Sequence, residues 1–166
     1  MHEDLSFLSV PYSPWWYNVV MKYYGYDAFS KDVKVLSEKV KPFEPEAIIA
    51  IARGGMMLAQ LMAHALHIRN VQSIRTEGYD GDHKRDDVKI FGSCDLHNVK
   101  RVVIVDDIVD SGDTLEAILG YLKSSFPEVT FITAAIFYKP TAVVQPDHAV
   151  RVADEWISFF WEADFA

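Results

Sequence analysis

Two kinds of hydrophobic pattern alternate along this chain. Runs that are apolar throughout, as in residues 47–52 and 102–105, predict strands buried on both faces. Apolar positions three and four residues apart, as in residues 29–40, predict amphipathic helices. The predicted elements are helices over 29–40, 56–66 (buried almost all round) and 115–122, and strands over 47–52, 71–75, 101–106, 130–138 and 149–152. Because strands alternate with helices, we predict an α/β fold with right-handed crossovers and a mainly parallel twisted sheet flanked by helices.

The length of 166 residues favours one domain of ordinary size. Residues 1–26 form an aromatic-rich N-terminal arm in which Pro11 and Pro14 prevent a regular helix. Aromatic side chains are costly to leave in water, so we expect the arm to pack on the body or on another subunit, or else to cover a ligand. We place the folded domain over residues 27–166. Residues 77–89 are polar and lack periodicity, which predicts a long loop of a kind that often carries function.

Charge and composition exclude several classes of function. Lys and Arg number 16 against 24 Asp and Glu, and the net charge of −8 disfavours nucleic acid and anionic membranes as partners. Cys94 is the single cysteine, so the sequence has no disulfide framework. Residues 1–26 lack the basic and apolar regions of a signal peptide, and no apolar run is long enough to span a membrane. We therefore expect a cytoplasmic protein.

The residues that could carry chemistry gather where predicted strands end. In open parallel sheets, ligands bind beyond the carboxyl ends of the strands. The strand over 101–106 runs into Asp106 and Asp107, and a turn with Ser111, Gly112 and Thr114 then opens a helix. Backbone N–H groups at a helix start, with hydroxyls and a glycine, suit a phosphate group. The two carboxylates suit either the vicinal hydroxyls of a ribose or a Mg²⁺ ion.

The sequence does not match other known phosphate-binding or metal-binding motifs that we considered. Neither GxxxxGK[ST] nor GxGxxG occurs. A phosphoacceptor receiver domain also has an acidic pair after a strand, but there the pair closes the first strand, whereas here a long folded segment precedes it. A calcium loop at Asp80 and Asp82 fails because Lys84 and Arg85 stand where that motif needs an oxygen ligand and a glycine.

One stretch is specific enough to indicate a family. Residues 102–114 (VVIVDDIVDSGDT) resemble the phosphoribosyl-pyrophosphate (PRPP) motif of type I phosphoribosyltransferases, most closely the small purine enzymes that act on guanine, xanthine or hypoxanthine. Residues 52–55 (ARGG) are similar to the pyrophosphate loop of that family, and residues 77–89 to its flexible catalytic loop. Residues 137–140 (FYKP) and 154–157 (DEWI) are similar to its base-recognition segments. The resemblance covers roughly residues 25–162 and implies a small hood formed by terminal segments and the flexible loop.

The resemblance implies a role for each matching residue toward PRPP. The 5-phosphate would be held by Ser111, Gly112, Asp113 and Thr114. The ribose hydroxyls would be bound by Asp106 and Asp107, directly or through Mg²⁺. The pyrophosphate would be held by Arg53, Gly54 and Gly55, in a loop where the family often has a non-proline cis peptide, expected here at Ala52–Arg53. The flexible-loop residues that would cover the reacting pyrophosphate are Tyr79, Lys84, Arg85 and Lys89.

A second set of residues would recognise the purine base. Asp110 would contact PRPP, hydrogen-bond the imidazole edge of the purine and act as acid and base, while Arg53 would stabilise the leaving pyrophosphate. Lys139 would donate to the 6-oxo group, which favours oxopurines over adenine. Trp156 would stack on the base, with Trp161 as the alternative, and the Ile157 carbonyl would contact the 2-position.

The function implied by the resemblance is purine salvage. The enzyme would convert PRPP and guanine, xanthine or hypoxanthine to the nucleoside 5′-monophosphate and pyrophosphate, with Mg²⁺, as a homodimer or homotetramer. The alternatives are a phosphoribosyltransferase for orotate or uracil and a non-catalytic PRPP-sensing regulator. Two positions depart from the family pattern: Phe160 replaces a proline in the usual Pro-Trp-Asp/Glu, and Gly78 replaces a frequent serine.

Overall fold

The structure is a computed structural model that describes residues 21–77 and 89–165. The strands are β1 (Met21–Tyr24), β2 (Ala47–Ala52), β3 (Asn70–Glu77), β4 (Lys89–Phe91), β5 (Arg101–Val109), β6 (Thr130–Tyr138), β7 (His148–Val152) and β8 (Trp156–Phe159). The helices are α1 (Tyr26–Val40), α2 (Gly55–Leu66), α3 (Asp113–Ser125) and the single turn α4 (Phe160–Ala163), with a 3₁₀ turn, η2 (Lys41–Phe43), after α1.

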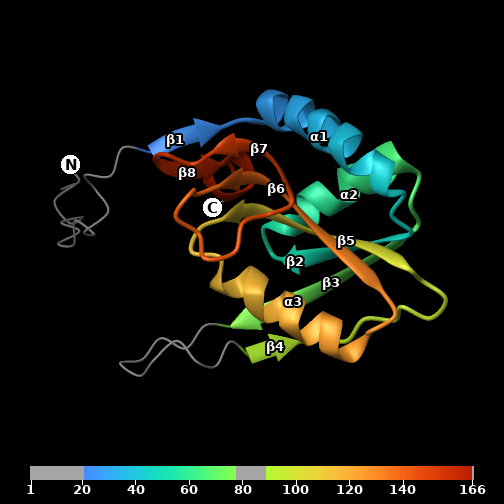
Figure 1. The fold of residues 1–166 in the computed structure, drawn as a ribbon. Helices are drawn as coiled ribbons and strands as arrows, with labels where there is room; N and C mark the ends of the chain where they lie inside the picture. Colours follow the sequence, from blue (N-terminus) through green and yellow to red (C-terminus); the bar gives the residue numbers. More distant parts are fainter. Residues whose placement is uncertain (1–20, 78–88, 166) are drawn as a thin grey trace, which may run out of the picture.

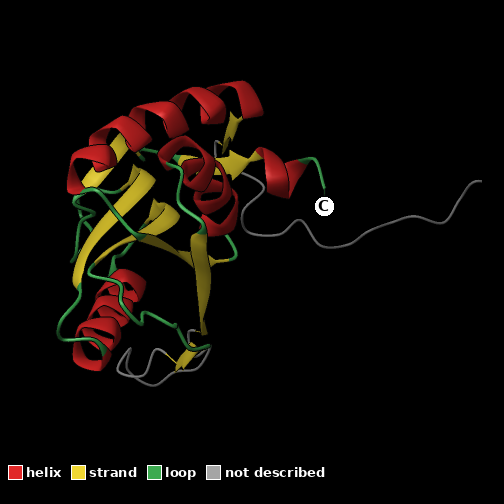
Figure 2. Ribbon diagram, turned by 90° about the vertical axis from the view of Figure 1, so that its right-hand side faces the viewer, coloured by secondary structure: helices red, strands yellow, loops and turns green. Residues whose placement is uncertain are grey.

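The main sheet places β2 and β5 at its centre (Figure 1). Over the described residues it has six strands in the order β4-β3-β2-β5-β6-β7. All neighbouring strands pair in parallel except β4, which lies antiparallel to β3 at one edge. Helices α1 and α2 cover one face and α3 covers the other (Figure 2). The chain leaves β2 toward β3 on one side and returns to β5 on the other, so the strand order reverses between β2 and β5.

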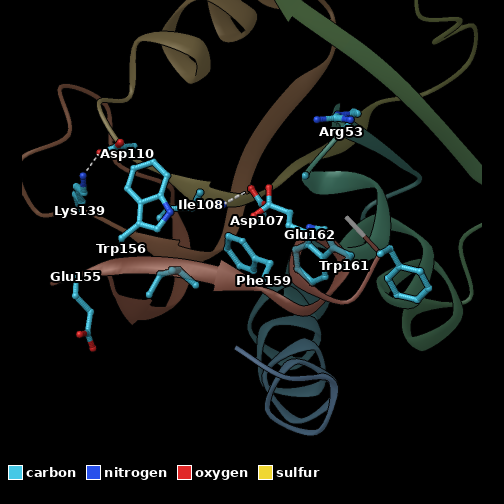
Figure 3. A pocket seen from close by; sticks show the side chains of 13 residues that line it. Arg53, Asp107, Ile108, Asp110, Lys139, Glu155, Trp156, Phe159, Trp161 and Glu162 are labelled. Atoms are coloured by element: carbon cyan, nitrogen blue, oxygen red, sulfur yellow. Dashed lines mark hydrogen bonds and ion pairs between the residues drawn. The ribbon is translucent and has the colours of Figure 1, made fainter. Parts of the chain in front are cut away.

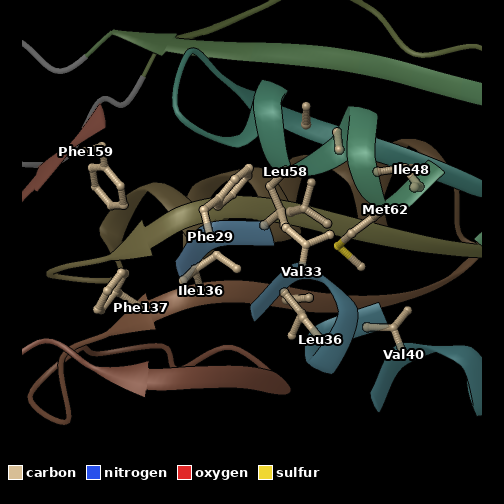
Figure 4. Close-up of a cluster of buried hydrophobic side chains, with 14 of the residues drawn as sticks. Phe29, Val33, Leu36, Val40, Ile48, Leu58, Met62, Ile136, Phe137 and Phe159 are labelled. Carbon is tan, nitrogen blue, oxygen red and sulfur yellow. The ribbon is translucent and has the colours of Figure 1, made fainter. Parts of the chain in front are cut away.

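The hydrophobic core has two layers because the sheet is buried on both faces. On the face covered by α1 and α2, Phe29, Val33, Leu36 and Val40 of α1 pack toward Leu58 and Met62 of α2 and toward Val103, Val105 and Ile136 of the sheet (Figure 4). On the other face, Val102 and Ile104 pack with residues of α3. The alternation of Val102 to Val105 between the layers explains why this strand is apolar at every position.

Strands β2 and β5 separate before they end. They pair from Ala47 with Val102 to Ala50 with Val105. Beyond that point Ile51 and Ala52 pair with β3 alone, while β5 continues beside β6 as far as Val109. The sheet therefore opens at the carboxyl ends of its two central strands, where the strand order also reverses and where ligands bind in folds of this kind.

A second, smaller sheet stands over this opening. Strands β1 and β8 pair in parallel, from Met21 with Trp156 to Tyr24 with Phe159. We call this two-stranded sheet the hood. It is tied to the main sheet by aromatic contacts with Phe137 of β6, because the centroid of that ring lies 4.8 Å from that of Tyr24 and 5.9 Å from that of Phe159.

The predicted fold class is confirmed, and the bounds of β2 and β6 agree with those predicted. Strand β5 continues three residues beyond the predicted end, because Ile108 and Val109 remain in the ladder with β6. The prediction that the helix over 56–66 is buried all round is wrong, since Met56 is 51% and Met57 38% exposed. Helix α2 lies on the outside of the sheet, so only one side of it meets the core. Strands β1, β4 and β8 were not predicted.

The core predicts a clear contrast between two neighbouring positions of α1. Leu36 is fully buried, whereas Val35 is 47% exposed. We expect Leu36→Ala to lower the free energy of unfolding by about 2–5 kcal/mol, because it leaves a cavity between α1 and the sheet. Val35→Ala should change it by about 0.5 kcal/mol or less. Urea denaturation measures both, and equal losses would contradict the packing described here.

Candidate active site

A cleft of about 760 Å³ lies at the carboxyl ends of the central strands, between the main sheet and the hood. Its walls are formed by Arg53, Gly54, Asp107, Ile108, Asp110, Lys139, Glu155, Trp156, Ile157, Phe159, Trp161, Glu162 and Phe165. In Figure 3, Asp110, Lys139 and Trp156 lie at one end of the cleft, Arg53 lies at the other, and Asp107 lies between them. The structure thus brings together site residues predicted from segments far apart in the sequence.

The loop from β2 to α2 presents Arg53 to the cleft. The Ala52–Arg53 peptide is cis, as predicted. Gly54 packs directly on the Asp107 side chain, and a Cβ there would lie 2.3 Å from a carboxylate oxygen. At Gly55 a Cβ would lie 2.3 Å from the Val105 carbonyl oxygen. The two glycines therefore allow the loop to enter the split between β2 and β5, and this close approach leaves Arg53 exposed at the end of the cleft.

The two adjacent carboxylates differ in their relation to the cleft. The Asp107 N–H donates a hydrogen bond to Asp106 Oδ1 at 2.9 Å. Asp107 lines the cleft, and the cleft lining among the described residues does not include Asp106. The shared role that the sequence predicts for the two residues stays a prediction.

Asp107 is a buried acid that forms no ion pair with any of the described Lys, Arg or His side chains. The residue is only 7% exposed, and its Oδ1 accepts a hydrogen bond from the Ile108 N–H at 2.8 Å. Burial, together with the negative charge of Glu162, raises the pKa of Asp107 to about 6, against the lowering effect of that hydrogen bond. Burial and the neighbouring Asp107 charge also raise the pKa of Asp106. A cation or a hydroxyl donor at this position would relieve the penalty.

The turn before α3 has the conformation that the sequence led us to expect. Gly112 has φ +87°, in the region that favours glycine, and a Cβ there would lie 2.7 Å from backbone atoms of Val144. The Val143 N–H donates to the Ser111 carbonyl at 2.8 Å, which holds the turn against the loop after β6. The Ser111 hydroxyl donates to the Asp113 carboxylate at 2.9 Å. Residues 111–114 adjoin the cleft through Asp110 but are not part of its lining.

The other end of the cleft combines a charged pair with an exposed aromatic ring. Lys139 Nζ lies 2.5 Å from Asp110 Oδ1, which joins the end of β6 to the end of β5. Trp156 is 59% exposed and lines the cleft, whereas Trp161 stacks on Phe159 at 4.6 Å and packs against Phe29 and Phe160. Of the two candidate stacking residues, the free ring is therefore that of Trp156.

Sequence reasoning missed several residues of the cleft. Glu162 lines it and acts electrostatically on Asp107, while Phe159 forms part of its apolar wall. The signal for Glu162 was present, because the residue follows Trp161 where the family pattern has an acid. Glu155 also lines the cleft and lies 3.4 Å from Lys22 of β1. Of the predicted loop residues, Lys89 begins β4, and Tyr79, Lys84 and Arg85 lie outside the described residues.

The donor set fits a divalent cation that arrives with a polyphosphate. Over residues 21–77 and 89–165 there is no cluster of three or more His, Cys, Asp or Glu side chains that could hold a metal ion. Mg²⁺ bound with a diphosphate needs only one or two carboxylates, since the substrate oxygens and waters complete the coordination. Asp107 offers one buried carboxylate with a raised pKa.

Over residues 21–77 and 89–165, no helix is long and apolar enough to cross a membrane.

Comparisons with known proteins agree with this geometry. A family model described as the phosphoribosyl transferase domain matches residues 28–166. A xanthine-guanine phosphoribosyltransferase of Idiomarina loihiensis is 26% identical over 151 residues, or 89% of this chain and 90% of the relative. A xanthine-guanine-hypoxanthine phosphoribosyltransferase structure from Helicobacter pylori has a TM-score of 0.81 at 35% identity, covering 88% of this chain and 96% of the other.

A further solved structure is also similar to this chain. The structure of a purine phosphoribosyltransferase from Pyrococcus horikoshii has a TM-score of 0.76 at 32% identity, covering 86% of this chain and 93% of the other. The fold, the cleft between hood and sheet and the family match together define the class: this chain belongs to the phosphoribosyl transferase family. The family resemblance given by residues 102–114 is thereby confirmed.

The buried charge of Asp107 predicts a pH-dependent effect on stability. With a pKa of about 6 in the folded state and about 3.9 in the unfolded chain, the folded protein binds the proton more tightly. Stability is therefore lost as the pH rises through 6, and Asp107→Asn avoids that loss. We expect the variant to be more stable than the wild type by about 1–3 kcal/mol at pH 8 and about equal to it near pH 4.

Urea denaturation at both pH values, without PRPP or metal, measures this difference. The exposed Glu128→Gln variant is the control for removing one negative charge. If Asp107→Asn differed from the wild type by the same amount at pH 8 and pH 4, Asp107 would not carry a raised pKa.

Proposed function

We propose that this chain is a purine phosphoribosyltransferase that transfers the 5-phosphoribosyl group of PRPP to an oxopurine. The observation that carries this proposal is the single cleft that joins the Arg53 loop and Asp107 to Lys139, Asp110 and Trp156. Relatives that cover most of the chain are named as purine enzymes for xanthine, guanine and hypoxanthine. These names favour a purine over orotate or uracil, and they favour an enzyme over a non-catalytic regulator.

The PRPP half of the site rests on the ends of β2 and β5. Ser111, Gly112, Asp113 and Thr114 hold the 5-phosphate at the N-terminus of α3, where backbone N–H groups and the helix dipole favour an anion. Asp106 and Asp107 bind the ribose hydroxyls, directly or through Mg²⁺. Arg53 binds the pyrophosphate with a guanidinium fork, and the close packing of Gly54 and Gly55 brings the loop backbone near the same group.

The base half rests on the ends of β5 and β6 and on the hood. The ring of Trp156 offers a stacking surface for a planar base. Lys139 donates to the 6-oxo oxygen, and Asp110 accepts from or donates to the imidazole edge. The 2.5 Å contact between Lys139 and Asp110 in the free protein supports this assignment, because it holds a donor and an acceptor at the spacing of neighbouring groups on one base edge. The Ile157 carbonyl contacts the 2-position.

The reaction forms one bond at the anomeric carbon of the ribose and breaks another. The nitrogen of the purine imidazole ring bonds to that carbon, the bond to the pyrophosphate oxygen breaks, and pyrophosphate departs with the electron pair. Asp110 takes the proton that the purine nitrogen loses. Arg53 stabilises the negative charge that develops on the leaving pyrophosphate. Asp106 and Asp107 would hold Mg²⁺ together with oxygens of PRPP, and the ion would supply positive charge to the diphosphate.

Two further expectations stay predictions. One is the assembly of the protein as a homodimer or homotetramer, and the other is its location in the cytoplasm. The N-terminal arm, residues 1–26, also stays a prediction as a unit separate from the domain. Residues 1–20 lie outside the described residues, and residues 21–24 form β1.

A substrate panel tests the proposed function. The purified protein is incubated with PRPP and Mg²⁺ and with guanine, xanthine, hypoxanthine, adenine, orotate or uracil in turn, and pyrophosphate and nucleoside monophosphate are measured. We expect turnover with at least one oxopurine, loss of turnover with excess EDTA, and recovery when Mg²⁺ is restored. Release of pyrophosphate with none of the six bases would contradict the proposal.

A variant at Trp156 tests where the base binds. Loss of stacking on an aromatic side chain costs about 1–3 kcal/mol, so Trp156→Ala should raise the KM for the base roughly 5–150-fold. The KM for PRPP should change little, because Trp156 lies at the other end of the cleft from Arg53. Tyr121→Ala, at an exposed aromatic residue of α3, is the control. Equal effects on both KM values would place the base elsewhere.

A further inference from the structure

A buried carboxylate ties the hood to the rest of the molecule. Asp32 of α1 is 5% exposed and faces two donors from different elements. The Tyr24 hydroxyl of β1 donates to Asp32 Oδ2 at 2.6 Å. Arg151 of β7 donates to the same carboxylate through Nε at 2.5 Å and through Nη2 at 3.1 Å. The three side chains therefore join the first strand of the hood, the first helix and the edge strand of the main sheet.

The chemistry of Tyr24 and Arg151 makes their hydrogen bonds to Asp32 persistent and well oriented. Burial and the Asp32 charge raise the pKa of Tyr24, so its hydroxyl remains a donor at any physiological pH. Arg151 contacts Asp32 with two nitrogens, a fork that fixes orientation as well as distance. A buried carboxylate with such partners is costly to separate from them, because an unpaired charge would remain out of water.

The network leads directly to the base end of the cleft. Tyr24 pairs in register with Phe159, and three residues earlier Met21 pairs with Trp156, so the position of β1 sets the position of β8. The Tyr24 ring also packs edge-on against both Phe159, which lines the cleft, and Phe137, two residues before Lys139. Among the described residues, the hood is a sheet of its own with no ladder to the main sheet. Side-chain contacts therefore contribute to its position, together with the short connections from β1 to α1 and from β7 to β8.

We propose that Asp32, with Tyr24 and Arg151, is a positioning site for base recognition: it holds the hood at the distance from Lys139 and Asp110 that a planar base requires. None of the three lines the cleft. They act through β8 and the Trp156 ring. The Arg53 loop and the turn before α3 belong to the main sheet, so PRPP binding does not depend on this network. The inference rests on the proposed function, because it concerns the base half of that site.

Two conservative variants test the proposal in the full chain. Asp32→Asn keeps the shape of the side chain and removes its charge, and Tyr24→Phe keeps the ring packing and removes only the hydroxyl. We expect Asp32→Asn to raise the KM for the oxopurine about fivefold or more, and Tyr24→Phe to raise it about twofold to fivefold, with the KM for PRPP within about twofold of the wild type. Steady-state kinetics with each substrate varied separately gives both values.

Val40→Ala is the matched control. Val40 is fully buried on the same helix as Asp32, at the far end of the core from the hood (Figure 4). Its truncation should lower the melting temperature at least as much as Tyr24→Phe does and leave both KM values unchanged. A merely stabilising role for Asp32 predicts the same kinetic pattern for all three variants, and that result would overturn the inference. Equal rises in both KM values would overturn it as well.

The outcome for the wild type separates the two claims. If the wild type turns over no oxopurine, the proposed function fails before any variant is compared. If the wild type is active and Asp32→Asn and Tyr24→Phe leave the KM for the base unchanged, the function stands and the positioning role is refuted.

Discussion

Strands β2 and β5 stop pairing after Ala50 and Val105, and the site depends on that separation. Up to that point the two strands form the centre of a sheet buried on both faces. Beyond it, β2 follows β3 and β5 follows β6, so a space opens inside the sheet at its carboxyl edge. The Gly54 backbone and the Asp107 carboxylate fill that space together, at a distance that leaves no room for a Cβ. The Asp107 carboxylate thus lies at the centre of an apolar sheet, at the position where the sheet opens to the cleft.

The same separation explains how a protein of net charge −8 can bind a polyanion. Long-range attraction is absent, so binding must come from groups at short range. Arg53 reaches the cleft from one side of the split, and the start of α3 provides backbone donors on the other. The raised pKa of Asp107 is the cost of placing an acid there without a cation. In the proposed mechanism, a cation that binds with the substrate would remove that cost and would thereby couple the two binding events.

The sequence predicts the main sheet far better than the hood, and the reason is physical. Residues 47–52 and 130–138 are strongly apolar and bounded by turns, so pattern alone defines them. Strands β1 and β8 have four residues each and pair only with one another, so their formation depends on a contact between positions more than a hundred residues apart. Local pattern does not contain that information. The motif in residues 102–114 indicates the family, but it does not indicate that Asp107 lines the cleft while Asp106 is outside the lining formed by the described residues.

The fold also places the proposed PRPP-binding groups and the proposed base-binding groups on different structural elements. In the proposed site, the groups assigned to PRPP follow strands of the main sheet, whereas those assigned to the base belong to the hood and to the ion pair of Lys139 and Asp110. A two-stranded sheet is not stable alone in water, so its position is only as well defined as the side chains beneath it. Aromatic packing supplies the attraction but tolerates sliding, since edge-on ring contacts are favourable over a range of offsets. Hydrogen bonds that reach one buried carboxylate from two directions break when the hood shifts. Asp32 therefore fixes the position of the hood more precisely than the edge-on contact between Tyr24 and Phe159 can.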